Sequence, residues 1–370
     1  MAAKVVDVHT HVYPPQYVSI LKTRSKVPYV RDTEPGKPSR LIILPGEDDP
    51  SSESTAKGRP IGSEYYDINK KIEFMDLHGI DISVISLANP WLDFLDPSEA
   101  GSLAKTVNDA MNDMCHSHKG RLFAFGALPL SAPTEEIVDE VKRLAKLKYM
   151  RGIIMGTSGL GKGLDDQDLD RVYQALEETG MTIFLHPHYG LPKEVFGPRA
   201  AEYGHVLPLA LGFPLETTIS VSRMILSGVF DRFPNLSVLL AHSGGTLPFL
   251  AGRLESCILH DAHYSGPEAA SASRRSIWEI LKTNILLDAV VYSGLGIRAA
   301  ATASGADRVL FGTDHPFFPP LETNSGEEEE KWLSVTTNYK AIQDAFGPEK
   351  DQAAAVLGGN AIRLLNLTTD

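Results

Sequence analysis

The sequence predicts an α/β fold in which eight parallel strands alternate with helices and close into a (β/α)8 TIM barrel. Short apolar runs alternate with segments of helical periodicity along the chain. The runs are nearly continuous, which is typical of parallel strands covered by helices on both sheet faces. Polar residues follow the first, fifth, sixth and eighth runs. A closed barrel brings the carboxyl ends of these strands around one mouth, whereas an open sheet would scatter them.

The bulk composition is that of a soluble globular protein, with no disordered or fibrous bias. The chain has 370 residues, of which 43% are hydrophobic and 22% are charged. By size it could form two domains, but α/β barrels of this length fold as one. We therefore expect a single barrel domain over residues 1–370.

Charge and cysteine content limit the partners and the compartment. The net charge of −12, from 35 basic and 47 acidic residues, argues against a nucleic-acid partner, although a local basic pocket for a small anion is allowed. Only Cys115 and Cys257 occur, so there is no disulfide framework and no CxxC metal motif. Met1 leads directly into the first strand, and no apolar stretch of 18 residues follows. We expect a cytoplasmic protein with no membrane partner.

The first predicted strand starts at Val5 and ends in His9-Thr10-His11. Residues two apart in a strand point to the same face, so both imidazoles can reach one divalent cation. Taken alone, this pair could equally be two unrelated core histidines.

Residues 12–67 are predicted to be a long loop insertion that covers the site. Pro14 and Pro15 stop the first strand, and further prolines follow as far as Arg59. Loops of this length are usually either functional covers or disordered. Within the segment, residues 41–44 could form a short hairpin or an edge strand, and Arg59 could face either solvent or the site.

The middle of the chain alternates regularly between the two element types. Asn89 lies just beyond the second strand, where barrel enzymes place their chemistry. The helices expected here cover residues 69–79, 98–118, 134–147 and 168–178, and the strands cover residues 82–87, 122–128, 152–155 and 182–185.

The later strands end in polar residues, as the first one does. The fifth strand runs into His186, the sixth into His242 and the eighth into Asp314. The remaining elements are helices over residues 213–230 and 296–303, strands over residues 236–241, 284–288 and 308–311, and a helix-rich tail over residues 332–367. The tail could pack against the barrel or against a partner.

Four strand-end residues have the right chemistry for one metal ion. A mononuclear divalent site needs three or four nitrogen or oxygen ligands within about 2.0–2.2 Å of the ion. His9, His11, His186 and Asp314 can supply them. His186 alone could be bonded to backbone and Asp314 alone could cap a helix, but the agreement of these strand ends favours a metal. Zn²⁺ is expected, with Mn²⁺ or Co²⁺ as alternatives, and no organic cofactor is needed.

The remaining histidines carry weaker signals. His242 would either lie behind the ligands or act as an acid or base. Five others are expected to be structural or to lie on the surface: His188, His205, His260, His263 and His315.

Four segments together resemble the amidohydrolase superfamily, in particular its aminocarboxymuconate-semialdehyde decarboxylase-like branch. They are Val6-Asp7-Val8-His9-Thr10-His11, His186-Pro187-His188, His242-Ser243-Gly244-Gly245 and Gly312-Thr313-Asp314-His315-Pro316. The resemblance spans nearly the whole chain. It implies a distorted (β/α)8 barrel that holds one metal, usually zinc, and non-oxidative decarboxylation of aromatic or enamine-like acids.

Within this branch, Arg59, Asn89 and Arg253 make the chain similar to the fungal iso-orotate (uracil-5-carboxylate) decarboxylases. That likeness implies conversion of uracil-5-carboxylate to uracil and carbon dioxide in thymine and pyrimidine salvage. It also implies a small carboxylated substrate and, because related enzymes form one, a homodimer.

The implied reaction assigns roles to the site residues. Loss of carbon dioxide from an sp² carbon leaves a poor carbanion, so the ring carbon is better protonated first. Asp314 is the expected proton donor, and His242 assists it or orients a bound group. Arg59 and Arg253 could make charge-assisted hydrogen bonds to the substrate carboxylate, although Arg253 could instead pair with Asp314.

Two further residues are expected to contact the substrate ring. Asn89 offers amide groups that suit a pyrimidine edge. Phe317 could wall the ring or simply pack in the core.

Other reactions are compatible with the same motifs. The substrate could be a hydroxybenzoate or aminocarboxymuconate semialdehyde. A mononuclear metal-dependent hydrolase would use a metal-bound water with His242 as its base, and a non-catalytic metal-binding module is a further alternative. A two-metal site is not expected, because the fourth strand reads Ile153-Ile154-Met155-Gly156 and lacks the lysine that bridges two metals in dinuclear amidohydrolases.

Overall fold

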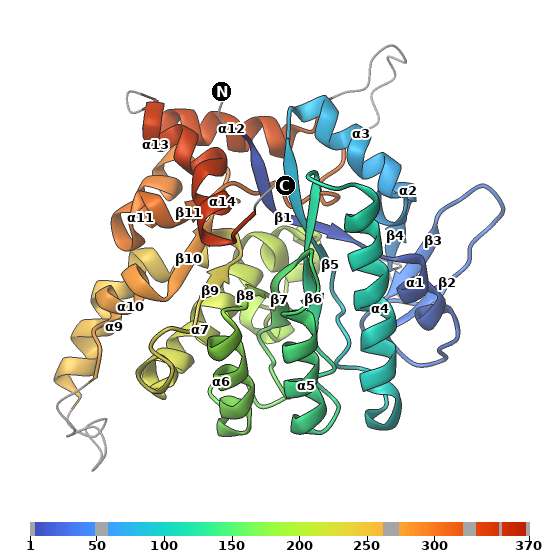
Figure 1. Cartoon of the computed structure of the whole chain (residues 1–370), viewed down its shortest axis with the longest axis horizontal. Helices are drawn as coiled ribbons and strands as arrows, with labels where there is room; N and C mark the ends of the chain where they lie inside the picture. Colours follow the sequence, from blue (N-terminus) through green and yellow to red (C-terminus); the bar gives the residue numbers. More distant parts are fainter. Residues whose placement is uncertain (1–3, 49–57, 262–273, 321–330, 348–349, 368–370) are drawn as a thin grey trace.

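A barrel of parallel strands forms the centre of the molecule (Figure 1). The computed structural model describes residues 4–48, 58–261, 274–320, 331–347 and 350–367. Its larger sheet has eight strands in the order β1-β5-β6-β7-β8-β9-β10-β11, and neighbouring strands are parallel. These are β1 (Val6–Val12), β5 (Ile82–Leu87), β6 (Leu122–Ala127), β7 (Met150–Gly156), β8 (Thr182–His186), β9 (Val238–Leu240), β10 (Ile285–Asp288) and β11 (Val309–Leu310). All of them lie where the sequence predicts strands, and the predicted (β/α)8 barrel is confirmed.

The barrel closes where β1 meets β11. Thr10 pairs with His315 in an isolated parallel bridge, and the backbone N–H of Val8 donates to the carbonyl of Phe311 at 3.0 Å. Every residue of β1, β5 and β6 is buried. Burial on both faces explains why these strands have nearly continuous apolar sequences.

The helices begin and end at the residues that the sequence marks for this purpose. The side chain of Asp67 caps α3 by accepting a hydrogen bond from the backbone N–H of Asn69, and Gly79 ends the helix in the left-handed conformation with φ 67°. Asp96 caps α4 in the same way through the N–H of Ser98.

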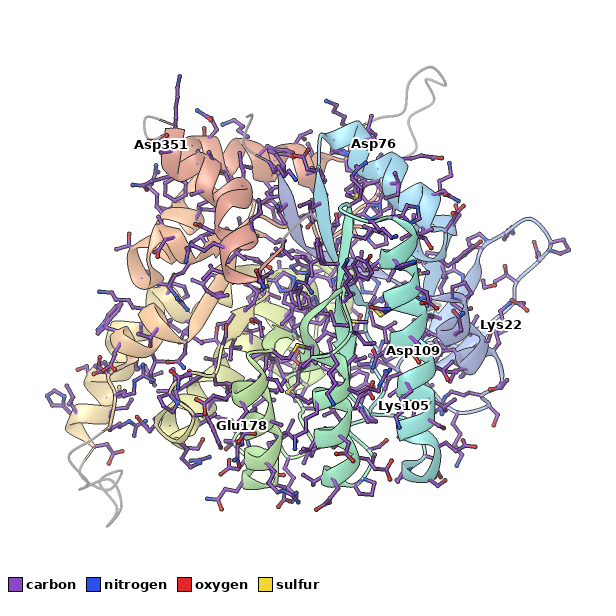
Figure 2. All side chains as sticks on the ribbon, in the orientation of Figure 1. Lys22, Asp76, Lys105, Asp109, Glu178 and Asp351 are labelled. Carbon is purple, nitrogen blue, oxygen red and sulfur yellow. The ribbon has the colours of Figure 1, made fainter. Side chains whose placement is uncertain are left out.

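Helices form the outer layer of the barrel, and many of their charged side chains face outward. Lys105 and Asp109 on α4 and Glu178 on α6 are exposed on this layer (Figure 2). The layer contains α3 (Ile68–His78), α4 (Pro97–Ser117), α5 (Thr134–Leu144), α6 (Asp170–Thr179), α7 (Phe213–Leu226), α8 (Val229–Arg232), α9 (Leu247–His260), α10 (Ile277–Thr283), α11 (Gly294–Ser304), α12 (Leu333–Phe346), α13 (Lys350–Ala354) and α14 (Asn360–Leu364). The C-terminal tail packs on the barrel, since the N–H of Phe311 donates to the carbonyl of Val356 at 3.0 Å.

The segment over residues 12–67 is more ordered than a long loop. It contains α1 (Pro15–Lys22), a three-stranded antiparallel sheet and α2 (Ser63–Tyr66). The sheet consists of β2 (Tyr29–Arg31), β3 (Ser39–Ile42) and β4 (Arg59–Ile61). The segment therefore folds into short elements, and β3 overlaps residues 41–44, where a hairpin or edge strand is expected. The reason is local packing: Val30, Leu41 and Ile61 each bury an apolar side chain in a strand too short to show periodicity.

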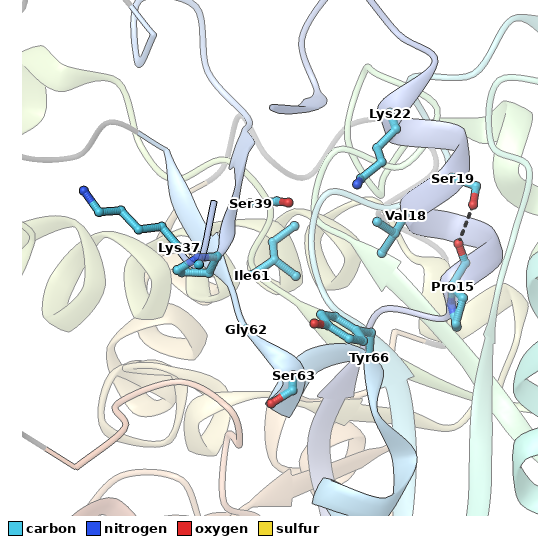
Figure 3. Close-up of a pocket in the computed structure, with 12 residues that line it drawn as sticks. Pro15, Val18, Ser19, Lys22, Lys37, Ser39, Ile61, Gly62, Ser63 and Tyr66 are labelled. Atoms are coloured by element: carbon cyan, nitrogen blue, oxygen red, sulfur yellow. Dashed lines mark hydrogen bonds between the residues drawn. The ribbon is translucent and has the colours of Figure 1, made fainter. Parts of the chain in front are cut away.

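A surface groove lies between α1 and this small sheet (Figure 3). Val18, Lys22 and Ile61 line it, together with Lys37 and Tyr66. None of the predicted site residues lines the groove, so it is separate from the chemistry considered below.

One continuous apolar helix was not expected from the sequence. A π-helical turn over Pro208–Gly212 runs into α7, and Pro208–Leu226 is long and apolar enough, by length and composition only, to cross a membrane. The helix nevertheless carries Glu216 and buries it among the residues of α7 that face the barrel.

Candidate metal centre and active site

The four predicted ligand residues form one buried cluster. The side chains of His9, His11, His186 and Asp314 come together so that one ligand atom from each lies within 4.8 Å of the others. The Nε2 atoms of the three histidines and Oδ1 of Asp314 are buried and have no hydrogen-bond partner among the described residues. Three imidazoles and one carboxylate with such free ligand atoms fit a single divalent cation.

The strands place these side chains as the sequence predicts. His9 and His11 project from β1 to the same side, and His186 is the last residue of β8. Asp314 follows β11 in a left-handed turn with φ 61°, and its backbone N–H donates to the carbonyl of His9 at 2.7 Å. Oδ1 of Asp314 then lies 3.3 Å from Nε2 of His9 and 3.5 Å from Nε2 of His11.

Burial and nearby charges set the protonation states of the cluster. Burial lowers the pKa of His11 to about 4 and holds the pKa of His186 well below its usual value. Burial would lower the pKa of His9 as well, but the carboxylates of Asp314 and Asp288 outweigh it and raise this pKa to about 10. Burial would raise the pKa of Asp314, but the charge of His9 and the nearby imidazoles of His11 and His242 hold it well below its usual range. His11, His186 and Asp314 are thus in the forms that bind metal, neutral imidazole and ionised carboxylate, whereas His9 has to release a proton when an ion binds.

Asp288 is a site residue that the sequence analysis missed. It is fully buried at the end of β10, and its Oδ2 accepts hydrogen bonds from Nδ1 of His9 at 2.6 Å and from the N–H of His242 at 3.1 Å. Its Oδ1 accepts from the N–H groups of Ser243 at 2.8 Å and Val290 at 3.0 Å. With Nδ1 of His9 donating to Asp288, the lone pair of Nε2 is free for a metal.

The sequence contained a usable signal for Asp288. It is the last residue of the seventh predicted strand, at the same strand end as the predicted ligands. It was missed because an aspartate without a neighbouring histidine gives no metal-ligand pattern.

His242 lies beside the ligand cluster. Its Nε2 is 3.8 Å from Oδ2 of Asp314, and its ring centroid is 5.2 Å from that of His9 and 5.1 Å from that of His186. The side chain is partly exposed, whereas the predicted ligands are buried. A small movement would allow His242 to exchange a proton with the free oxygen of Asp314.

Arg59 faces the site, not solvent. Its Nη1 donates to the hydroxyl of Tyr13 at 2.8 Å and to the carbonyl of Asn89 at 3.0 Å. Its guanidinium lies 4.7 Å from the ring centroid of Phe317, and that ring lies 5.6 Å from the ring of His11. No carboxylate of the described residues forms an ion pair with Arg59. A partly buried cation beside the cluster is therefore available to an anionic ligand.

Asn89 holds Arg59 in place. Its Oδ1 accepts a hydrogen bond from Nη2 of Arg59 at 3.0 Å, and its Nδ2 donates to the carbonyl of His188 at 2.9 Å. The side chain thus ties the end of β5 to the segment after β8. Contact between Asn89 and a pyrimidine edge stays a prediction.

Arg253 does not join the cluster within one chain. It is exposed on α9, a helix that projects away from the barrel (Figure 1). Among the described residues, it forms no ion pair with Asp314. Its predicted role in binding substrate therefore depends on something outside the single chain.

The fourth strand of the barrel leaves no room for a bridging lysine. Gly156 ends β7 opposite His186. A Cβ atom at Gly156 would lie only 2.6 Å from Nδ1 of His188 and 2.8 Å from Cζ3 of Trp91. Both rings already fill the space that a longer side chain would need, which agrees with the expectation of one metal.

Four of the five histidines expected to be structural or on the surface lie in the described residues and divide into two groups. His188 and His315 are buried, and His205 and His260 are exposed. His263 lies outside the described residues.

Comparison with known proteins places the chain among relatives. Residues 6–367 match the family described as amidohydrolase. The 2-amino-3-carboxymuconate-6-semialdehyde decarboxylase of Dictyostelium discoideum is 27% identical, over 98% of this chain and 91% of that protein. The apo crystal structure of Metarhizium anisopliae IDCase is 55% identical with a TM-score of 0.93, covering 99% of this chain and 98% of that one.

A third structure shares the fold. The 5-carboxyvanillate decarboxylase of Novosphingobium aromaticivorans, complexed with manganese and 4-hydroxy-3-methoxy-5-nitrobenzoic acid, is 21% identical with a TM-score of 0.75 and covers 99% of this chain and 96% of that one. Because the family match extends over nearly the whole chain, the protein belongs to the amidohydrolase family.

Proposed function

We propose that this protein is a metal-dependent, non-oxidative decarboxylase that converts uracil-5-carboxylate (iso-orotate) to uracil and carbon dioxide. The observation that carries the proposal is the position of Arg59, a partly buried cation beside a ligand cluster that fits one metal ion. Such an arrangement attracts a small planar anion. The 55% identity to IDCase, an iso-orotate decarboxylase, over nearly the whole chain supports this choice of substrate.

His9, His11, His186 and Asp314 would hold the metal. When bound, a divalent ion supplies a positive charge and Lewis acidity to the carboxylate and ring oxygen of the substrate. The imidazole-rich ligand set suits Zn²⁺, and Mn²⁺ and Co²⁺ are compatible alternatives.

Asp314 delivers the proton that the reaction consumes. Its Oδ1 faces His9 and His11, whereas its Oδ2 faces His242. Because its pKa is held well below the usual range, this carboxyl is ionised at rest and must first take up a proton; once protonated, it is a strong acid toward the ring carbon. His242 is placed to return a proton to Oδ2 afterwards.

Arg59 orients the substrate against this donor. Its charge pairs with the substrate carboxylate until carbon dioxide leaves, and Phe317 lies close enough to both Arg59 and His11 to wall the ring.

The direct test is to mix zinc-loaded protein with uracil-5-carboxylate and to detect uracil by mass spectrometry, with a chelator-treated sample as control. Uracil that forms only with metal supports the proposal. Bound metal without uracil overturns the choice of substrate, and the same assay is then run with hydroxybenzoates.

A second candidate reaction uses the same residues. The similarity to an aminocarboxymuconate-semialdehyde decarboxylase over 98% of the chain favours that compound as the alternative substrate.

A metal-dependent hydrolase would release no carbon dioxide. Carbon dioxide measured beside the organic product therefore distinguishes a decarboxylase from a hydrolase.

We also propose that the protein acts as a cytoplasmic homodimer in pyrimidine salvage. Large apolar side chains are exposed on α7 and α9: Ile219 is 50% exposed, Phe249 84% and Leu259 75%. Arg253 lies one helical turn from Phe249 on the same exposed face of α9. A second copy that covers this face would bring Arg253 to the interface between the chains.

A further inference from the structure

The predicted metal ligands lie on both sides of the line along which the barrel closes. His9 and His11 belong to β1, and Asp314 follows β11. These two strands are joined by an isolated bridge and a few backbone hydrogen bonds, and not by a continuous ladder. The spacing of the ligands therefore depends on whatever else holds the two sides together.

Lys71 is a buried lysine that contacts both sides of this line. It lies on α3 with 1% of its surface exposed. Its Nζ donates to Oγ1 of Thr10 on β1 at 2.6 Å and to Nδ1 of His315 beyond β11. The Thr10 hydroxyl in turn donates to the carbonyl of His315 at 3.1 Å.

Asp7 makes the matching contacts with the opposite charge. It is fully buried on β1, and its Oδ2 accepts from the hydroxyl of Thr313 at 2.7 Å. Its Oδ1 accepts from the backbone N–H groups of Thr313 and His9, both at 3.1 Å. Asp7 and Lys71 also attract each other electrostatically, which offsets part of the cost of burying two charges.

The partners of this pair lie beside the metal ligands in the sequence. Thr10 lies between His9 and His11, and Asp314 lies between Thr313 and His315, whose side chains also contact the pair. A shift of Asp7 or Lys71 would therefore move the ligand residues through the backbone, although neither side chain contacts a metal-binding atom.

We propose that Asp7 and Lys71 form a buried clamp across the β1–β11 junction that positions the metal ligands on its two sides. They are positioning residues, and they contact neither the substrate nor the metal. This inference rests on the proposed metal site, because it concerns how tightly and in what geometry that site binds its ion.

The test measures metal binding directly. Wild-type protein and the variants Lys71→Met and Thr10→Val are titrated with Co²⁺ against a competing chelator, and the visible spectrum of the bound Co²⁺ and the Tm are recorded. Thr10→Val removes the hydroxyl shared by Lys71 and His315 while nearly keeping its size, so it tests the clamp even where Lys71→Met fails to fold.

Glu140→Gln is the matched control. Glu140 is also buried and hydrogen-bonded, at 2.7 Å to Nδ2 of Asn108 on α4, but it lies between α4 and α5 and makes no hydrogen bond to a predicted ligand. Glu140→Gln is therefore expected to lower the Tm without moving the metal ligands.

The clamp predicts that Lys71→Met and Thr10→Val bind Co²⁺ about 10–100-fold more weakly than wild type, as removal of groups that support metal ligands does elsewhere. It also predicts an altered Co²⁺ spectrum in both variants, whereas Glu140→Gln keeps the wild-type affinity and spectrum. If Lys71→Met and Thr10→Val lower the Tm but keep the wild-type Co²⁺ affinity and spectrum, the clamp proposal is wrong and the proposed metal site is unaffected. Wild-type protein that binds no Co²⁺ overturns both.

Discussion

Asp288 supports two different parts of the site through its two carboxylate oxygens. One oxygen accepts a hydrogen bond from Nδ1 of His9, and the other accepts one from the backbone N–H of Ser243. Ser243 lies in a turn in which His242 and Ser243 adopt positive φ values of 55° and 53°. A single buried carboxylate therefore orients a predicted ligand and the backbone that carries the acid–base histidine. This dependence makes Asp288 more sensitive to substitution than its lack of any predicted role suggests.

We expect Asp288→Asn to weaken metal binding about 10–100-fold, because the amide can no longer offer an acceptor to both His9 and the turn. Uracil formation should fall with it. Metal content after dialysis against a weak chelator, and kcat at saturating metal, would show this. Metal content equal to that of wild type would contradict the role given to the Asp288–His9 hydrogen bond.

Asp314 is proposed to combine metal binding with proton transfer, and the two proposed roles can be tested separately. Asp314→Asn keeps an oxygen near His9 and His11 but cannot donate an acidic proton. We expect it to lower kcat by about 100-fold or more while it keeps much of the substrate affinity. Rapid-mixing kinetics and a separate binding measurement with the substrate would separate the effects, and turnover at the wild-type rate would refute the proton-donor role.

At the scale of elements, a short strand carries Arg59, the residue proposed to bind the substrate carboxylate. Arg59 starts β4, which pairs with β3 through the neighbours Leu41 and Arg59, and Leu41 is completely buried. The small sheet is therefore the support that holds the guanidinium over Phe317. Arg59 could not have been placed from the sequence, because its direction depends on a sheet formed by strands of three or four residues.

Arg59→Gln should lower kcat/KM for uracil-5-carboxylate by about 10–100-fold, because a charge-assisted hydrogen bond is worth about 1.5–3 kcal/mol. Arg31→Gln is the matched control: Arg31 lies in the same sheet and forms an exposed ion pair with Asp48, which contributes little. Steady-state kinetics with both variants would check this. Equal losses in the two variants would mean that the effect comes from the sheet and not from the charge of Arg59.

The elements that were predicted well from the sequence are those whose own residues determine the local structure. The barrel strands were recognisable because burial on both faces requires apolar residues, and α3 was recognisable from Asp67 and Gly79 at its ends. The small sheet was foreseen only near residues 41–44, because its strands of three or four residues are too short for periodicity to be visible. Likewise, Lys71 on α3 gave no signal, because its burial follows from how the helix packs on the barrel.

At the scale of the whole molecule, the sequence predicted which strand ends would meet, but not which surface residues could serve a second chain. The cluster of His9, His11, His186 and Asp314 follows from the barrel alone, since strand ends converge at its mouth. The role of Arg253 does not follow from the barrel, because it depends on a partner that covers α9. Its exposure in the single chain is compatible with substrate binding only if it acts in the site of another copy.

Mixed dimers test this arrangement. A two-fold interface exchanges equivalent residues, so Arg253 of each copy would serve the site of the other. Homodimers of Arg253→Ala and of Asp314→Asn should both form little uracil. A heterodimer of the two, purified through two different affinity tags, would combine an intact Asp314 with an intact Arg253 in one of its sites and should regain about half of the wild-type rate. If Arg253 acts within its own chain, each site of the heterodimer carries one defect and no activity is recovered. If Arg253 has no role, the Arg253→Ala homodimer is already active on its own.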